Sequence, residues 1–404
     1  MRIAVPIRSK NYYRLLGPVV EEALRRGHEV DCHQWSGPAK GESPFSGPPL
    51  EFREGTPRVL SYRSAEELAE CWRWEPPDAV VSIDPPGELR GAAKSRWLWL
   101  QYGADMALLP EQQGFFDADA VAFYSAHWRE LIRARHRDVE LGAELDRKSV
   151  IVGAPELDAV HAIDRESARQ RLGLPADRPV VLYLPFPLHS NPRTSWLASV
   201  YRPSTRIEQA VRLLATGRRQ YWRHAREGRN DRRLVEAARR FCDRNGALLV
   251  MKARDKDWPP RYASRLADRV LGDESHHPPT ILELMRVASL CVHFYSTAAM
   301  EAAYCGVPSL CLAPEPLELA EPSHLAAFPF HDIHNGEAGG IYNAPGVAYW
   351  RPLDSAFDGL GSWSLADFPL DGEARRRYVE AFLGSDDGRS AGRLIDALSP
   401  AGDG

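Results

Sequence analysis

Residues 280–312 read TILELMRVASLCVHFYSTAAMEAAYCGVPSLCL, and this stretch decides the fold class of the chain. Apolar residues follow helical spacing over 280–287, form a short continuous run over 290–294, and return to helical spacing over 298–304. A second continuous run follows at 308–312. Short buried runs that alternate with amphipathic stretches are typical of a parallel sheet covered by helices, so the pattern predicts helix, strand, tight turn, helix and strand.

The tight turn in this stretch is a candidate phosphate-binding site. Ser296 and Thr297 lie between the carboxyl end of the predicted strand and the start of the next helix. Unpaired backbone N–H groups and the positive end of the helix dipole favour an anion there. Small hydroxyl residues can cap the helix and leave space for a diphosphate, and Glu301, one turn on, could accept hydrogen bonds from ribose hydroxyls. In the structural alternative, Ser296 only caps the helix and Glu301 only adds a favourable first-turn charge.

The same alternation extends along the whole chain in two series. Its 404 residues suit two domains of roughly 150–200 residues each. The stretch 154–179, rich in Pro and Gly, is predicted to join the series, and 324–352 is predicted to be a long loop. The first series has candidate strands at Arg2–Ile7, Glu29–His33, Arg58–Tyr62, Ala79–Ile83, Trp97–Gln101, Ala120–Tyr124 and Ser149–Val152, and candidate helices at Gly17–Arg26 and Ala65–Trp72. The second has strands at Val180–Leu184, Ala247–Met251, Leu290–Phe294 and Pro308–Leu312, and helices at Arg232–Asn245, Thr280–Val287, Ala298–Tyr304, Glu373–Leu383 and Arg389–Leu398.

Composition and charge argue against several classes of protein. The formal net charge is -4, which gives no reason to expect a polyanionic partner for the whole chain. No apolar stretch reaches the roughly 18 residues of a spanning helix, and Pro6 interrupts the apolar N-terminal run, so we expect a cytoplasmic protein without a secretory signal. None of the six cysteines forms a C-x-x-C pair, so buried reduced thiols are expected rather than disulfides or zinc ligands.

Residues 280–312 also carry a resemblance to a known family. After the first helix and strand come Ser296-Thr297, then Glu301-Ala302, then Gly306-Val307-Pro308. This order resembles the donor-binding segment of GT-B glycosyltransferases, most closely the CDP-glycerol glycerophosphotransferase and capsule-polysaccharide transferase group, with the non-hydrolysing UDP-GlcNAc 2-epimerases more distant. The resemblance implies that the backbone of Ser296–Ala298 holds the donor phosphates and that Glu301 holds the ribose.

The resemblance also implies an architecture, an α/β fold with two Rossmann-like, doubly wound domains facing a cleft. Residues 1–165 would form the acceptor-binding domain, residues 166–385 the nucleotide-donor-binding domain, and residues 386–404 a closing helix and tail. The similarity covers mainly residues 179–398, and the first domain matches only in its order of elements.

Three further residues are predicted to contact the donor. Lys252 and Arg254 follow a predicted strand, where two cations can neutralise a diphosphate, although the related group usually has Lys-Pro-His-Pro there. His189 follows the first strand of the second domain, where it could contact phosphate or base. Near the end of the chain, Asp387-Gly388 followed by Arg393 is similar to a closing segment of the same group.

Candidates for proton abstraction follow the strands of the first domain, because ligands of open α/β sheets bind at the carboxyl ends of strands. Tyr102 stands where related transferases often have histidine, but its ordinary pKa of about 10 makes it a poor base. Asp84 or Asp105 could take the proton instead, although Asp84 could equally start the Pro-Pro-Gly turn that follows it. The other candidates after these strands are Glu88 and His127, and Arg8 and Lys10 in the loop after the first strand could approach the cleft.

No cofactor or metal ion is predicted. The loop after the first strand contains no glycine, so the G-x-G-x-x-G fingerprint of dinucleotide-dependent oxidoreductases is absent. Asp255-Lys256-Asp257 spells a D-x-D motif, but no other feature supports the GT-A fold that uses it, and we interpret it as solvated loop. The arginine-rich segment 202–244 favours a solvated helical excursion, with contact to an anionic acceptor or a membrane surface as the alternative. The negative net charge of the whole chain disfavours nucleic-acid binding.

These observations predict a metal-independent glycosyltransferase that moves a sugar from a nucleotide-activated donor to a small-molecule, glycan or lipid-linked acceptor. Alternatives that stay open are a CDP-glycerol-type polyol-phosphate transferase, a sugar-nucleotide epimerase and a non-catalytic nucleotide-sugar-binding protein.

Overall fold

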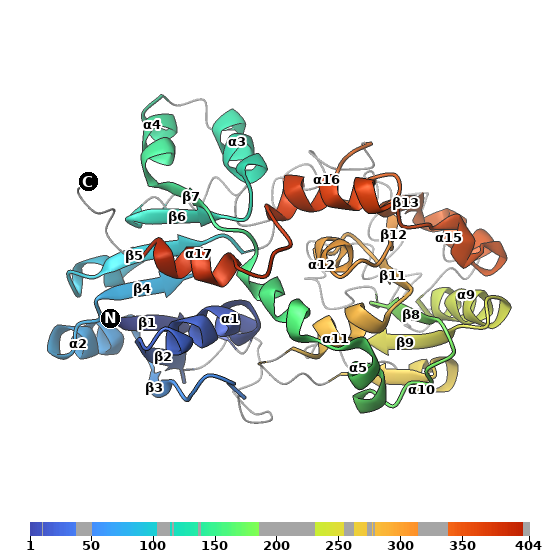
Figure 1. Ribbon diagram of the computed structural model, residues 1–404, viewed down its shortest axis with the longest axis horizontal. Helices are drawn as coiled ribbons and strands as arrows, with labels where there is room; N and C mark the ends of the chain where they lie inside the picture. The colour runs from blue at the N-terminus through green and yellow to red at the C-terminus, as the bar shows by residue number, and fades with distance from the viewer. Residues whose placement is uncertain are drawn as a thin grey trace, which may run out of the picture. The chain divides into compact units, whose positions relative to one another are not determined.

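The computed structural model of the chain forms two compact units (Figure 1). Unit 1 comprises Met1–Ala162, Glu274–Leu282 and Arg377–Gly404, and unit 2 comprises Ile163–Asp273 and Glu283–Arg376. The domain boundaries expected from the sequence stay a prediction. The structure describes residues 1–9, 11–37, 51–102, 114, 117–135, 139–185, 231–253, 262–272, 277, 279–313 and 338–398.

Unit 1 is built on a parallel sheet with strand order β3-β2-β1-β4-β5-β6-β7. Most of its strands are short apolar runs buried on both faces, as parallel strands covered by helices must be. The chain order reverses between β1 and β4, which makes their carboxyl ends the topological switch point where such sheets bind ligands. The strands are β1 (Arg2–Ile7), β2 (Glu29–Trp35), β3 (Arg58–Tyr62), β4 (Ala79–Ser82), β5 (Arg96–Leu100), β6 (Ala120–Phe123) and β7 (Ser149–Ile151).

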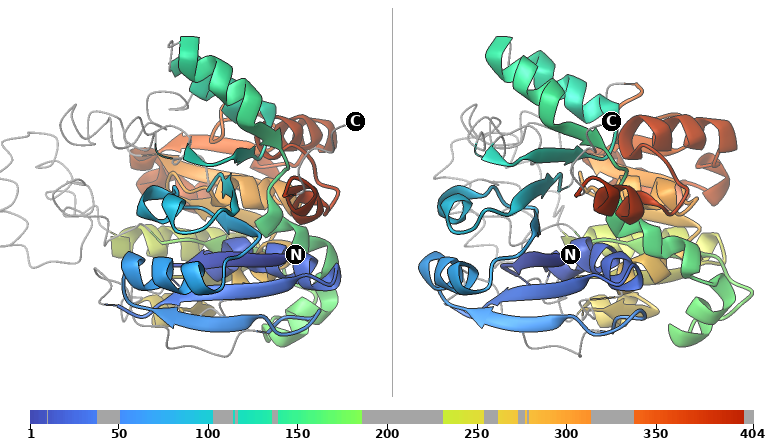
Figure 2. Two further views of the ribbon diagram at one scale, coloured as in Figure 1. Left: turned by 90° about the vertical axis from the view of Figure 1, so that its left-hand side faces the viewer. Right: turned by 60° about the vertical axis from the view of Figure 1, so that its left-hand side comes forward.

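Helices cover both faces of this sheet. Figure 2 shows α17 beside α1 on one face and α2 on the other, and Arg26, which directly follows α1, contacts Asp396 of α17 at 2.5 Å. The helical elements of unit 1 are α1 (Asn11–Arg25), α2 (Ala65–Trp74), η1 (Gly87–Gly91), α3 (Ala126–Arg135), α4 (Val139–Lys148), η3 (Pro155–Ala162) and α17 (Ser390–Asp396).

Helix α1 starts earlier than the sequence predicts. The predicted start at Gly17 was wrong, because Gly17-Pro18 looks like a boundary but lies inside the helix. Tyr13, Leu16 and Val20 share one buried face, so packing carries the helix through the proline. Gly17 is also required by a close approach, since a Cβ there would collide with the imidazole ring of His277.

Unit 2 repeats the same plan with strand order β10-β9-β8-β11-β12-β13, again parallel throughout. Its switch point lies between β8 and β11. The strands are β8 (Val180–Tyr183), β9 (Leu248–Lys252), β10 (Arg269–Leu271), β11 (Leu290–His293), β12 (Ser309–Ala313) and β13 (Ala348–Pro352). The helical elements are α5 (Arg165–Arg171), α9 (Asp231–Arg244), α10 (Ala263–Leu266), α11 (Thr280–Val287), α12 (Ala298–Tyr304), α15 (Leu353–Gly359), η5 (Leu360–Ser362), η6 (Leu365–Asp367) and α16 (Gly372–Leu383). Two of these helices are shared, since the first residues of α11, up to Leu282, and the last residues of α16, from Arg377, belong to unit 1.

Two strands of unit 2 were not predicted from the sequence. Residues 348–352 were predicted to belong to a long loop, but they form β13, which pairs with β12 from Ser309↔Ala348 to Ala313↔Pro352. Strand β10 has only three residues. Both are edge strands, so neither needs the continuous apolar run that identifies a strand buried on both faces.

Helix α9 closes one face of the unit 2 sheet with an apolar side. Leu234, Val235, Ala238 and Phe241 pack in the core with side chains of β8 and β9. This helix contains the described part of the arginine-rich segment 202–244, and its residues belong to the fold of unit 2. The remainder of that segment lies outside the described residues.

The last part of the chain returns to unit 1. Trp128 donates its indole N–H to the carbonyl of Phe382 at 2.7 Å, and Gly384 adopts a left-handed φ of 80° close to the carbonyl of Tyr124. The segment similar to the family's closing motif lies here. Arg393 donates to the carbonyl of Val152 at 2.8 Å and to the carboxylate of Asp387 at 2.7 Å.

Candidate functional site

A polar cluster occupies the switch point of unit 1. Asp84 lies just beyond β4, and Arg8 and Tyr12 follow β1. The Tyr12 hydroxyl lies 2.9 and 3.0 Å from the two carboxylate oxygens of Asp84, and Arg8 Nε lies 3.3 Å from Oδ2. The hydroxyl of Ser82 accepts a hydrogen bond from the Asp84 N–H at 2.9 Å, which fixes the backbone there. The cluster therefore presents an aligned carboxylate where ligands of this sheet type bind.

Burial and charge act in opposite directions on Asp84. Burial raises the pKa of its carboxyl, while the Arg8 guanidinium and the Tyr12 hydrogen bond offset part of that rise. The pKa of Tyr12 is raised by burial and by the Asp84 charge, so this hydroxyl keeps its proton and stays a donor. A carboxylate with a raised pKa is better matched to proton transfer near neutral pH than an ordinary one.

Of the other two predicted catalytic residues, the structure describes one. Tyr102 is 41% exposed, two residues beyond β5, and its phenol contributes to the raised pKa of Tyr12, so it lies near the Asp84 cluster. Asp105 lies outside the described residues. His127 lies in α3, with its ring against Trp128 and Phe382, an apolar setting that does not suit a catalytic base.

In unit 2 the turn between β11 and α12 has the predicted place at the switch point. The Ser296 hydroxyl accepts from the Ala298 N–H at 3.2 Å, and the Ser296 N–H donates to His293 Nδ1 at 3.3 Å. Thr297 holds the N-cap position without a side-chain cap bond. The Ser296 hydroxyl therefore does cap the first turn of α12, whereas phosphate binding at this turn stays a prediction.

An unusual backbone conformation shapes this turn. Tyr295 has a φ of 41°, a left-handed conformation that costs a non-glycine residue about 1–2 kcal/mol. The ring of Tyr295 lies edge-on to Tyr342 at 5.2 Å, and its hydroxyl accepts from the Trp350 indole N–H at 3.4 Å. Packing against β13 thus offsets the strain. Burial lowers the pKa of His293 to about 3, so this ring is neutral and can accept the Ser296 N–H.

Glu301 lies in the first turn of α12 but is only 7% exposed. Burial, with repulsion from Glu301, raises the pKa of the Cys291 and Cys305 thiols, so the carboxylate lies close to both. A ribose could therefore reach only the outer edge of the Glu301 side chain.

Lys252 ends β9 at the same edge of the sheet. Tyr183 of β8 pairs with both Met251 and Val292, so the next residues, Lys252 and His293, stand level on either side of β8. Two strand spacings separate their backbones by roughly 10 Å. Lys252 is 8% exposed, and its ammonium group donates to the Ala253 carbonyl at 3.5 Å. Arg254 and His189, the other predicted donor ligands, lie outside the described residues.

Two residues of the unit 1 cluster were not predicted from the sequence in the place that the structure gives them. Arg8 was named without a predicted partner, and Tyr12 was not named as a site residue. Tyr12 lies in the predicted loop before Gly17, and only the earlier start of α1 turns it toward Asp84. The sequence signal that could have identified Tyr12 is its position, since it is a polar residue about one helical turn after the first predicted strand.

Neither a metal centre nor a membrane span occurs in the described parts of the chain. No group of three His, Cys, Asp or Glu side chains is placed there to hold a metal ion. No helix among these residues has the length and apolar character needed to cross a bilayer.

Comparison with solved structures identifies the fold. The sequence matches no protein-family model and no curated protein. The fold is similar to that of the wall teichoic acid polymerase TagF, with a TM-score of 0.55 and 13% identity, covering 98% of this chain and 88% of that one. It is equally similar to UDP-GlcNAc 2-epimerase from Neisseria meningitidis bound to UDP-GlcNAc, with a TM-score of 0.55, 12% identity, and coverage of 98% and 99%. The S. aureus MnaA–UDP co-structure matches with a TM-score of 0.53, 12% identity, and coverage of 98% and 95%.

At these identities the likeness establishes the fold, a GT-B fold with two Rossmann-like domains, as the sequence predicted. The resemblance to the CDP-glycerol polymerase group and to the 2-epimerases is confirmed at the level of structure. Enzymes of both kinds share the fold equally well.

Proposed function

We propose that the protein is a glycosyltransferase that moves a sugar from a nucleoside-diphosphate donor to an acceptor hydroxyl without a metal ion. One observation carries the proposal: each sheet of a GT-B fold has a polar constellation at its switch point, a carboxylate in unit 1 and a hydroxyl–carboxylate–lysine set in unit 2. Solved structures with this fold contain UDP, UDP-GlcNAc or CDPG. The donor is thus assigned to unit 2 and proton transfer to unit 1.

In unit 2, we assign the donor diphosphate to the Ser296–Ala298 backbone and to Lys252. The diphosphate would replace His293 Nδ1 and the Ser296 hydroxyl as the acceptors of the Ser296 and Ala298 N–H groups. An ammonium group beside a diphosphate offsets the charge that develops on the leaving group, which is the role a metal ion has in other transferases. Glu301 would accept from the ribose at its exposed edge, and Arg254 and His189 remain proposed ligands.

In unit 1, we assign Asp84 as the base that takes the proton of the acceptor hydroxyl. Its carboxylate is oriented by Tyr12 and Arg8, and its raised pKa favours proton uptake. Tyr102 would donate a hydrogen bond to the acceptor rather than act as base, because a phenol is a poor base near neutral pH. Asp105 remains the second candidate for the base.

The donor assignment is tested by thermal shift against UDP-, GDP-, CDP- and TDP-linked sugars. One nucleotide should raise the melting temperature by several degrees, because a ligand that binds only the folded state stabilises it by mass action. Glu301→Gln should remove most of that shift, whereas Glu166→Gln, an exposed carboxylate of α5, should keep it. An unchanged shift in Glu301→Gln would refute the assigned donor site.

The catalytic assignment needs turnover of the donor that binds. Asp84→Asn should reduce turnover by about 10²–10⁴-fold, the usual contribution of a general base, and leave the donor-induced thermal shift intact. Glu70→Gln is the control, an exposed carboxylate of α2. Equal turnover in Asp84→Asn and Glu70→Gln would remove Asp84 from the mechanism.

Two other candidate functions are those of a sugar-nucleotide epimerase and of a CDP-polyol-phosphate transferase. The first is favoured by the likeness to the 2-epimerases and the second by the equal likeness to TagF. Incubation with the stabilising donor separates these functions. An epimerase converts the donor without an acceptor, and a polyol-phosphate transferase releases CMP rather than a nucleoside diphosphate. Binding without turnover would identify a non-catalytic nucleotide-sugar-binding protein.

A further inference from the structure

His293, the last residue of β11, bonds directly to the turn assigned to the donor diphosphate. Its Nδ1 accepts the Ser296 N–H at 3.3 Å. The side chain is 0% exposed, the Tyr342 ring lies 6.0 Å from it between centroids, and its strand neighbour in β12 is Cys311. The ring of His293 therefore holds an N–H group that a bound phosphate would need.

The imidazole of His293 is neutral and carries its one proton on Nε2. Burial lowers the pKa of His293 to about 3, and no charge from the described residues contributes to that shift. At pH 7 such a ring has a second proton in only about one molecule in a thousand to ten thousand. Because Nδ1 accepts the Ser296 N–H, the single proton must be on Nε2.

Nothing in the described part of the chain holds that proton in place. Nε2 of His293 is buried and has no hydrogen-bond partner among the described residues. Buried polar atoms are ordinarily paired, and in a histidine that pairing fixes the tautomer. The tautomer of His293 is thus set by the Ser296 N–H alone, and moving the proton to Nδ1 would break no hydrogen bond at Nε2.

His33 of β2 shows the opposite tautomer. Its Nε2 accepts the Trp72 indole N–H at 3.1 Å in the interior of unit 1, so its proton is on Nδ1. Burial, with the charge of Arg2, lowers the pKa of His33 to about 4, so this ring is neutral as well. His33 is therefore an internal reference for what His293 would become with its proton on Nδ1.

One phosphate oxygen could meet both Ser296 and His293. Their nitrogen atoms are 3.3 Å apart, so an oxygen at the usual distance of about 2.9 Å from each forms an ordinary triangle. Phosphate oxygens only accept, so a lone pair on Nδ1 would repel the anion, whereas an N–H there would donate to it. The ring is fully buried, so the turn must move to admit the oxygen, and Tyr295, with its φ of 41°, is the strained residue of that turn.

We propose that His293 changes tautomer when a diphosphate binds: the Ser296 N–H turns from Nδ1 to the phosphate, and Nδ1, now protonated, donates to the same phosphate. The inference rests on the proposed donor site in unit 2. One proton leaves Nε2 and one joins Nδ1, both exchanged with water as the turn opens, so the ring stays neutral. Protonation to an imidazolium is the alternative, and burial opposes it. His293 then accepts from the protein in the free state and donates to the ligand in the bound state.

Histidine-selective ¹⁵N labelling of the full chain tests the tautomer directly. The chain has 13 histidines, and loss of a signal in His293→Asn and in His33→Asn assigns these two rings. Pyrophosphate is the first probe, because every candidate nucleotide donor contains a diphosphate, and UDP, GDP, CDP and TDP follow. Saturating pyrophosphate should exchange the pyridine-type and pyrrole-type ¹⁵N shifts of His293, so that its pattern becomes that of His33. The pattern of His33 should not change.

Calorimetric titration of variants measures the hydrogen bond that His293 would donate. His293→Leu keeps a buried side chain but can neither accept nor donate, and should weaken pyrophosphate binding at least about tenfold. His293→Asn presents an amide near the Nδ1 position that accepts in one orientation and donates in the other, and should keep the affinity within about threefold. His33→Leu is the matched control, since it removes a neutral buried imidazole from unit 1, and should leave the affinity unchanged.

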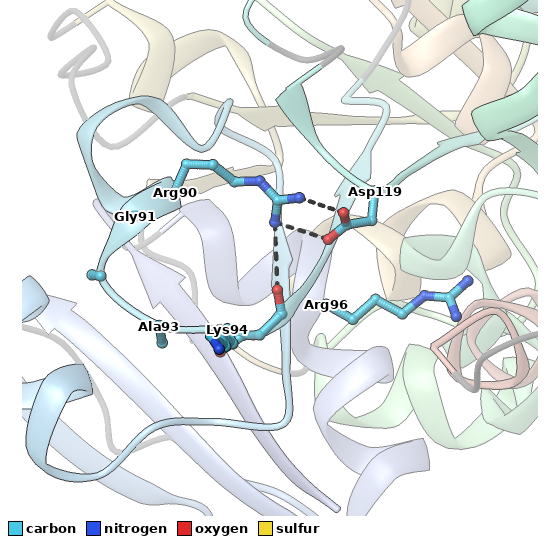
Figure 3. Close-up of a pocket in the computed structure, with 8 residues that line it drawn as sticks. Arg90, Gly91, Ala93, Lys94, Arg96 and Asp119 are labelled. Atoms are coloured by element: carbon cyan, nitrogen blue, oxygen red, sulfur yellow. Dashed lines mark hydrogen bonds and ion pairs between the residues drawn. The ribbon is translucent and has the colours of Figure 1, made fainter.

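Exposed cations can attract pyrophosphate without forming a site, so these titrations are run at constant ionic strength. Lys94 is such a cation, at the pocket on unit 1 that residues 90–96 and Asp119 line, where Arg90 is already paired with Asp119 at 2.8 Å (Figure 3). Lys94→Ala should therefore leave the response of the His293 ring unchanged.

Three results would overturn the inference. One is a His293 pattern that pyrophosphate and all four nucleotides leave as it was; if one nucleotide still raises the melting temperature, the donor site stands without the tautomer change. Another is movement of both ¹⁵N shifts to imidazolium values, because that is protonation. The third is equal affinity in His293→Leu and His33→Leu. Exchanged shifts in a protein that transfers no sugar would support the inference and count against the transferase.

Discussion

At the scale of single residues, Asp231 shows how burial sets a titration. It is the first residue of α9, its side chain is buried, and the Tyr262 hydroxyl donates to its carboxylate. The Tyr183 hydroxyl and the Arg232 guanidinium also lie near this pair. Burial raises the pKa of Asp231 to about 6, while the Tyr262 hydrogen bond offsets part of the rise.

We predict that Asp231→Asn stabilises the protein at neutral pH. The folded-state pKa lies above the unfolded value of 3.8, so the folded state binds more protons and loses stability as pH rises from about 4 through 6. Asparagine keeps the acceptor for Tyr262 without the charge, so the variant should gain up to roughly 2–3 kcal/mol at pH 7.5 and less at pH 4.5. Urea denaturation at both pH values measures this difference. Asp177→Asn, an exposed control, should show no gain, and a gain in Asp231→Asn that does not depend on pH would contradict the prediction.

At the scale of elements, a strand is predicted more clearly from the sequence when both of its faces are buried. Strands in the middle of both sheets were predictable because they are buried on both faces and read as continuous apolar runs. The edge strands β10 and β13 carry no such run, and α1 was cut short at a proline that tertiary packing tolerates. The turn at Ser296 was predictable from local order alone. The Asp84 cluster was not, because β1 and β4 become neighbours only through the sheet topology.

Helix α12 depends on a partner at its carboxyl end. Arg375 of α16 donates to the carbonyls of Ala303 and Tyr304, each at 2.7 Å, and so adds a charged partner to carbonyls at the helix end. We predict that Arg375→Met lowers the free energy of unfolding by about 1–3 kcal/mol, because it removes charge-assisted hydrogen bonds at a helix terminus. Chemical denaturation measures the loss. Arg376→Met, an exposed neighbour, should lose little, and equal losses in both variants would assign no special role to Arg375.

At the scale of the whole molecule, the chain completes unit 1 only with its last described residues. Residues 377–398 lie far in sequence from β7, yet Arg393 donates to Val152 and Trp128 donates to Phe382. Gly153 has a φ of 91°, and a side chain there would collide with Ser390. The first unit is therefore assembled from both ends of the chain, an arrangement that no local pattern in the sequence reveals.

The Arg393–Asp387 pair gives this assembly a pH dependence that can be measured. The Arg393 hydrogen bond lowers the pKa of Asp387 to about 2, below its unfolded value of 3.8, so the pair stabilises the folded state above about pH 4 and is lost as pH falls toward 2. Asp387→Asn should therefore weaken the protein at pH 7 but not at pH 2. Arg393→Met should cost more, about 1.5–3 kcal/mol, because it also abandons the Val152 carbonyl. Hydrogen exchange should quicken in β6 and β7 while β8 and β9 keep their protection, and uniform quickening in both sheets would show that Arg393 does not act on unit 1 alone.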